Sequence, residues 1–113
     1  MAFTIITVSG TFQDTATTAP LAGTLTFTLA DAISNGTVTL TPSPIVVTLD
    51  NTGSFTINLA ATDDIGTTPT GVWYSVTEQI SGGSPRDYFI QILSGYPSSV
   101  SLASLTPGTP GWL

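Results

Sequence analysis

The most regular part of the chain is a pair of alternating apolar and polar runs at residues 45–49 and 55–59. A period of two is typical of strands that bury one face. Setting Leu49 opposite Phe55 places the apolar residues of both runs on one side and leaves a short loop that ends on Gly53. A type I turn with a bulge needs a left-handed residue at that position, which glycine supplies without strain. The pattern therefore predicts a β-hairpin.

A second alternating stretch, residues 72–93, contains a turn rich in glycine and serine. A two-residue glycine turn would set Glu78 opposite Asp87, and like charges directly opposed destabilise a strand pair. A shift by one residue sets Glu78 opposite Tyr88 and keeps the apolar side chains on one face. We predict this second register. It gathers three apolar side chains on the other face: Trp73, Phe89 and Leu93.

Shorter alternating runs and turn signals complete the pattern, with no helical period. Further strands are predicted at residues 3–12, 24–29, 37–40 and 100–102. The segment 61–71 is predicted to cross from one sheet to another. About seven short strands, spaced by turns, indicate an all-β fold, an antiparallel β-sandwich. We expect one domain over residues 1–105 and a Pro/Gly-rich C-terminal tail over residues 106–113.

The charge balance excludes one large class of partners. Charged residues make up only 7% of the chain, the formal net charge is −6, and Arg86 is the only basic residue. Nucleic-acid binding requires a basic surface that displaces counterions from phosphate groups. We therefore expect no nucleic-acid partner. The N-terminus lacks the basic start of a signal peptide, and its apolar run is too short for a membrane span, so we expect neither secretion nor membrane insertion.

The residue types that the chain lacks narrow the chemistry further. It contains no Cys, no His and no Lys. Thiol nucleophiles, imidazole bases, zinc sites with nitrogen or sulfur ligands and Schiff-base chemistry are thereby excluded. We expect no cofactor, no catalytic residues and no enzymatic activity.

Carboxylates are the remaining candidates for site chemistry. Asp63 and Asp64, with Glu78 nearby, offer clustered oxygen ligands for calcium. Calcium loops usually space their ligands at alternate positions, and adjacent aspartates in a Gly/Pro loop more often brace turns. Two carboxylates also serve glycoside hydrolysis, but nothing in this sequence sets a pair at a defined separation across a sugar cleft. We therefore predict no metal site, and calcium at Asp63 and Asp64 stays the alternative.

A resemblance to a protein family covers almost the whole chain. It is carried most clearly by Asp50 to Phe55, by Asp63-Asp64 with Thr68-Pro69 and Gly71, and by Tyr74 to Glu78. In these segments the chain resembles small virion proteins of tailed bacteriophages that infect actinobacteria. The resemblance implies an Ig-like or carboxypeptidase-regulatory-like sandwich. It also implies a non-catalytic structural role, as a minor tail component or a capsid decoration protein.

The expected partners follow from this resemblance and from the apolar face. They are virion proteins (a tail protein or the major capsid protein) and other copies of the chain, on the surface of a particle assembled in the host cytoplasm. A contiguous apolar patch usually marks an interface. A carbohydrate-binding or adhesin module that contacts a host glycan is the alternative, because aromatic side chains also stack on sugars. The predicted partner contacts are Trp73, Phe89, Leu93, Trp112 and Leu113.

Overall fold

The structure is a computed structural model that describes residues 3–14, 16–81 and 85–105. In these ranges the chain forms strands joined by turns and one short 3-10 helix, η1 (Leu102–Ser104). The strands are β1 (Ile5–Thr11), β2 (Gly23–Leu29), β3 (Ile33–Asn35), β4 (Val38–Leu40), β5 (Ile45–Thr48), β6 (Ser54–Ala60), β7 (Tyr74–Ile80), β8 (Arg86–Ile90) and β9 (Ser99–Ser101). None of the helical segments in this described part has the length and hydropathy needed to span a membrane.

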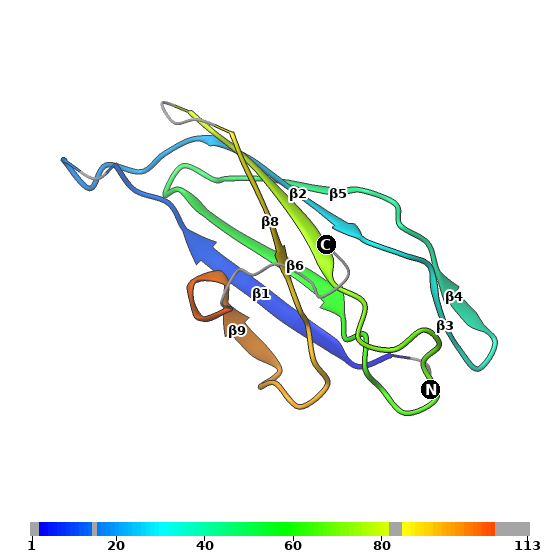
Figure 1. Ribbon diagram of the computed structural model, residues 1–113. Coiled ribbons are helices and arrows are strands. Elements are labelled where there is room, and N and C mark those ends of the chain that lie inside the picture. The colour runs from blue at the N-terminus through cyan, green and yellow to red at the C-terminus, as the bar shows by residue number, and fades with distance from the viewer. Residues whose placement is uncertain (1–2, 15, 82–84, 106–113) are drawn as a thin grey trace.

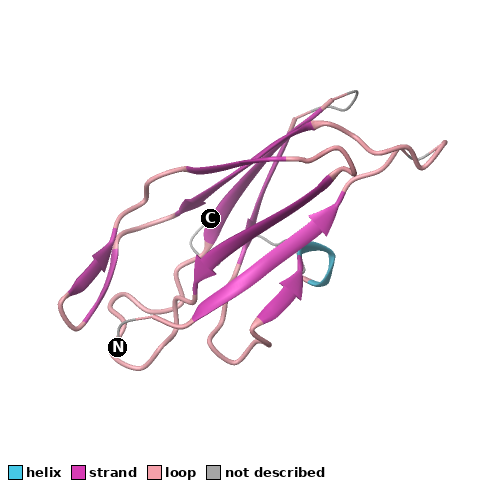
Figure 2. Cartoon of the chain, turned by 180° about the vertical axis from the view of Figure 1, so that it is seen from behind, coloured by secondary structure: helices cyan, strands magenta, loops and turns pink. Residues whose placement is uncertain are grey.

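The strands form two sheets that pack face to face. One sheet has the order β6-β1-β9 and the other has the order β5-β2-β7-β8, while β3 and β4 form a small separate hairpin at one end (Figure 1). The same two layers are seen from behind in Figure 2, with η1 directly after β9. The predicted all-β sandwich is therefore confirmed. The first sheet is mixed, because β9 runs parallel to β1.

The core lies between the two sheets and follows the predicted alternation. On β2, the three apolar residues Leu25, Phe27 and Leu29 are buried, and the threonines between them lie on the other face. Phe55 of β6 reaches across the core, with its ring 6.1 Å from that of Phe27. Gly10 of β1 leaves room for this ring, since a Cβ there would lie 2.8 Å from Phe55 Cε1. The two layers are thus joined by aromatic contacts near the end of β1.

The predicted hairpin over residues 45–59 is wrong. Strand β5 pairs with β2, and β6 pairs with β1, so the two strands belong to different sheets. The turn between them nevertheless has the predicted chemistry, with φ of +76° at Gly53 and Asp50 N–H donating to the Ser54 carbonyl at 2.9 Å. The predicted inner face is buried on β6 and at Leu49, whereas Ile45 at the start of β5 is 42% exposed. Two strands that face each other across a core satisfy the alternation as well as two strands side by side.

The predicted register of the second hairpin is also wrong, although its two faces are correct. Glu78 lies opposite Arg86 instead of Tyr88, a displacement of two residues. An even displacement leaves every side chain on its face. The observed register brings the Glu78 carboxylate against the Arg86 guanidinium, so a cross-strand ion pair decides between two registers that bury the same apolar residues.

The remaining predicted segments differ mainly at the ends. The segment 61–71 crosses between the sheets as predicted, because β6 and β7 lie in different layers. Strand β3 lies between the predicted strands at residues 24–29 and 37–40, where no strand was predicted, and it pairs with β4. The last strand is Ser99–Ser101, and Leu102 begins η1 instead of continuing it. The predicted tail, residues 106–113, lies outside the described residues.

Candidate functional site

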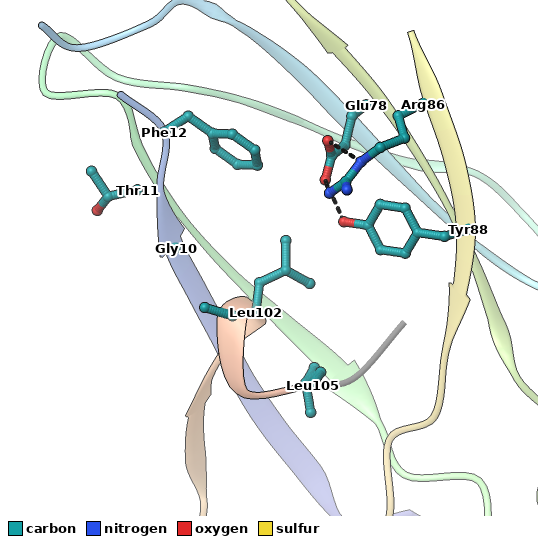
Figure 3. A pocket seen from close by; sticks show the side chains of 9 residues that line it. Gly10, Thr11, Phe12, Glu78, Arg86, Tyr88, Leu102 and Leu105 are labelled. Atoms are coloured by element: carbon teal, nitrogen blue, oxygen red, sulfur yellow. Dashed lines mark hydrogen bonds and ion pairs between the residues drawn. The ribbon is translucent and has the colours of Figure 1, made fainter. Parts of the chain in front are cut away.

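A cavity with both polar and apolar walls lies between the two sheets, on the side where η1 faces β8. Its volume is about 230 Å³. The end of β1 and η1 supply most of its apolar wall, while β7 and β8 supply the polar groups (Figure 3). The residues that line it are Gly10, Thr11, Phe12, Glu78, Arg86, Tyr88, Leu102, Ala103 and Leu105.

Three polar side chains in this cavity bond to one another. Arg86 Nε donates to Glu78 Oε1 at 3.1 Å, and its Nη2 donates to Oε2 at 3.0 Å. The Tyr88 hydroxyl donates to the same Oε2 atom. The guanidinium carbon of Arg86 also lies 4.7 Å from the centre of the Tyr88 ring. These contacts satisfy Glu78, which is 5% exposed, with two charge-assisted hydrogen bonds from arginine and one from a phenol.

The pKa values of the two donors, Arg86 and Tyr88, are both raised in this arrangement. The hydrogen bond to Glu78 raises the pKa of Arg86. Burial, followed by the hydrogen bond to Glu78, raises the pKa of the Tyr88 hydroxyl. A general acid or base works best with a pKa near the operating pH, and these two shifts lead away from neutrality. The three hydrogen bonds of this cluster brace β7 against β8.

A second tyrosine gives a test in alkaline solution. Tyr74 donates its hydroxyl to the Ala60 carbonyl at 2.8 Å, which ties β7 to β6 across the core. Burial raises the pKa of Tyr74 to about 12. Since the folded-state pKa is above the unfolded value of about 10, this contribution to stability is complete below pH 10 and is lost as the pH rises toward 12.

We expect the free energy of unfolding to fall by about 2 kcal/mol between pH 10 and pH 12 because of Tyr74. Denaturant unfolding at a series of pH values measures this change. The matched control is Tyr74→Phe, which should show a shallower decline over the same range, since it cannot ionise there. Parallel curves for the two proteins would contradict the assignment.

Asp63 and Asp64 brace backbone segments. Asp64 accepts hydrogen bonds from the Thr4 N–H at 2.6 Å and from the Thr4 hydroxyl at 2.8 Å. Asp63 accepts a hydrogen bond from the Ser94 N–H at 2.6 Å. Glu78 does not join them, because it lies beside Gly10, about 20 Å along β1 from Thr4. Within the described ranges, the structure contains no group of three His, Cys, Asp or Glu side chains that could hold a metal.

The predicted partner contacts lie partly within the described chain. Trp73, Phe89 and Leu93 are each half-buried. Phe89 lies opposite Ser75, so Trp73, two residues before Ser75, is its diagonal neighbour on the outer face of the four-stranded sheet. Leu93 lies in the turn after β8, where its carbonyl accepts a hydrogen bond from Tyr96. The other two predicted contacts, Trp112 and Leu113, lie outside the described residues.

The polar part of this cavity could be expected from the sequence, but its apolar wall could not. The inward side of β7 carries Glu78, and the chain's single basic residue, Arg86, was a natural partner for it. Nothing in the pattern joins these residues to the end of β1 or to η1, because those contacts depend on how the two layers stack.

The chain was compared with protein families, with curated proteins and with solved structures. No family model, no curated protein and no solved structure matches the chain.

Proposed function

We propose that the chain is a non-catalytic structural protein of a bacteriophage virion, a minor tail component or a capsid decoration protein that docks on other virion proteins. The resemblance of its segments to small virion proteins supports this role. The site geometry supports the non-catalytic part, since the Glu78 carboxylate is occupied by Arg86 and Tyr88.

The observation that carries the docking role is the outer face of the four-stranded sheet. Trp73 and Phe89 lie there as diagonal neighbours. The outward sides of β2 and β7 around them carry uncharged side chains, mostly short hydroxyl residues, and the charged residue on the adjoining part of β8 is Asp87. Aromatic side chains contribute strongly to protein interfaces when a partner covers them. The outward-facing hydroxyl side chains of these two strands are Thr24, Thr26, Thr28, Ser75 and Thr77.

The same face favours a second candidate, a carbohydrate-binding or adhesin module. An aromatic ring stacks on the apolar face of a sugar, and neighbouring hydroxyl groups supply hydrogen bonds to it. A glycan array probed with the purified protein distinguishes the two functions, because a docking surface for virion proteins has no reason to retain any glycan.

The test of the docking role replaces both aromatic residues, as Trp73→Ser with Phe89→Ser. We expect occupancy on assembled particles to fall at least tenfold while the melting temperature changes by only a few degrees, because both side chains lie outside the core. Quantitative mass spectrometry of purified particles measures the occupancy.

A matched control removes two exposed apolar side chains elsewhere, as Val38→Ser with Ile65→Ser. This variant should be incorporated normally. Normal incorporation of the Trp73 and Phe89 variant, or its unfolding, would remove the support for an intermolecular contact at this face.

A further inference from the structure

The edge strands of the two large sheets differ in the side chains that they expose. The outer strands are β6 and β9 in one sheet and β5 and β8 in the other. Strand β8 begins with the charged pair Arg86 and Asp87, and the exposed positions of β6 and β9 are polar. Strand β5 instead exposes Ile45 (42%) and Val46 (61%). It is the edge strand of these sheets with large apolar side chains in solvent.

The backbone of β5 also has hydrogen-bonding groups directed away from its sheet. Leu49 N–H donates to the Gly23 carbonyl of the β2 segment at 3.0 Å. Hydrogen-bonded positions alternate along an antiparallel pair, so Val47 and Ile45 also bond toward β2. The N–H and C=O groups of Val46 therefore face outward. Within the described residues, β5 has no strand partner on that side.

We propose that this edge pairs with β5 of a second copy of the chain, antiparallel about a two-fold axis, with Val46 opposite Val46 of the other copy. Directly opposed residues in an antiparallel pair lie on the same face of the sheet. A symmetric register must therefore set outward-facing residues opposite outward-facing residues, and inward-facing residues opposite inward-facing ones. The Val46-centred register meets this condition and uses the outward backbone groups of Val46 for two hydrogen bonds. It also sets Ile45 opposite Val47 on the inner side.

The charge distribution favours a second copy as the occupant. Two chains of net charge −6 repel each other, but residues 32–49 contain no charged side chain. In the proposed register Asp50 lies opposite Pro42, and the two Asp50 carboxylates lie about 27 Å apart along the strands. That separation exceeds the screening length of about 8–10 Å in ordinary buffers. This edge is thus a place where two copies can meet without opposing like charges.

A cysteine substitution tests the register directly, because the chain contains no cysteine. Opposed residues in a hydrogen-bonded antiparallel pair have Cα atoms about 5.5 Å apart, which is within the range for a disulfide. We expect the full chain with Val46→Cys to form a covalent dimer under mild oxidation. The matched control is Thr56→Cys, an exposed position on edge strand β6, which should stay largely monomeric.

Sedimentation velocity at increasing concentration provides the second readout. The unmodified chain should show a monomer–dimer equilibrium. Val46→Lys should weaken it at least tenfold by setting two like charges together, and Thr56→Lys should leave it unchanged. A strictly monomeric chain without a Val46→Cys crosslink would overturn the proposal. So would a dimer that Val46→Lys leaves intact, or an edge that binds only a different protein. These outcomes do not depend on whether the chain is a virion protein.

Discussion

Replacing Phe55 with alanine should lower the free energy of unfolding by about 4 kcal/mol, a large share of the roughly 5–15 kcal/mol typical of small domains. The Phe55 side chain is only 4% exposed. Its ring lies 6.1 Å from Phe27 of the opposite sheet and 6.4 Å from Phe12. Truncation therefore removes buried area, leaves a cavity and breaks an aromatic contact between the layers. Equilibrium unfolding in urea measures the loss.

The control for this substitution is Phe12→Ala. Phe12 is half-buried and lies next to the cavity beside η1, so its site is already partly open. The loss should be about 2 kcal/mol or less, since a smaller buried area is removed. Equal losses for the two variants would show that Phe55 has no special place in joining the sheets.

Replacing Gly53 with alanine should destabilise the fold by about 3 kcal/mol. Gly53 has φ of +76° and is buried, and a Cβ there would lie 2.4 Å from the Phe12 carbonyl oxygen. The contacted atom belongs to the backbone, so it cannot move aside as the end of a side chain can. The turn between β5 and β6 would have to shift, together with the Gly53 carbonyl that accepts a hydrogen bond from the Phe12 N–H.

The chain provides a matched control in Gly71. Its φ is +74°, nearly the same, and nothing lies within 4 Å of the position of a Cβ. Gly71→Ala should therefore cost only the conformational part, about 1 kcal/mol. The difference between the two variants in thermal or urea unfolding isolates the steric part. A cost for Gly71→Ala as large as that for Gly53→Ala would contradict this division.

The local features of the sequence predicted local features of the fold. The alternation on β2 correctly identified Leu25, Phe27 and Leu29 as core residues. The turn chemistry around Gly53 was also correct. The carboxylate of Asp50 accepts hydrogen bonds from the Thr52 and Ser54 N–H groups, and hydrogen bonds led by that of the Thr52 hydroxyl lower the pKa of Asp50.

The choice of strand partner could not be predicted in the same way. Strand β5 pairs with β2 and β6 pairs with β1, yet the inward faces of both strands are those that a hairpin would also turn inward. The alternation within one strand predicts which of its faces points inward. Which strand pairs with it depends on how all the strands are divided between the two sheets. The register of β7 and β8 was undecided for a similar reason. Two alignments bury the same apolar residues, and the observed one also forms the ion pair between Glu78 and Arg86.

The candidate site shows the same limit. The pairing of Glu78 with Arg86 could be expected in part, because Glu78 lies on the inward side of β7 and Arg86 is the single basic residue of the sequence. The apolar wall of the cavity could not be predicted, since Phe12, Leu102 and Leu105 come from segments that are distant in sequence from β7 and β8.

Strand β1 pairs with two strands that lie far from it in the sequence. Val8 lies opposite Ile57 on one side and opposite Val100 on the other. Both neighbours of β1 are therefore translated long after it, first β6 and then β9. A nascent chain interrupted before Ser99 has a first sheet that lacks one of its three strands. Bringing such distant segments together has a loop-closure cost in entropy. The three-stranded sheet can thus be completed only after residues 99–101 have been translated.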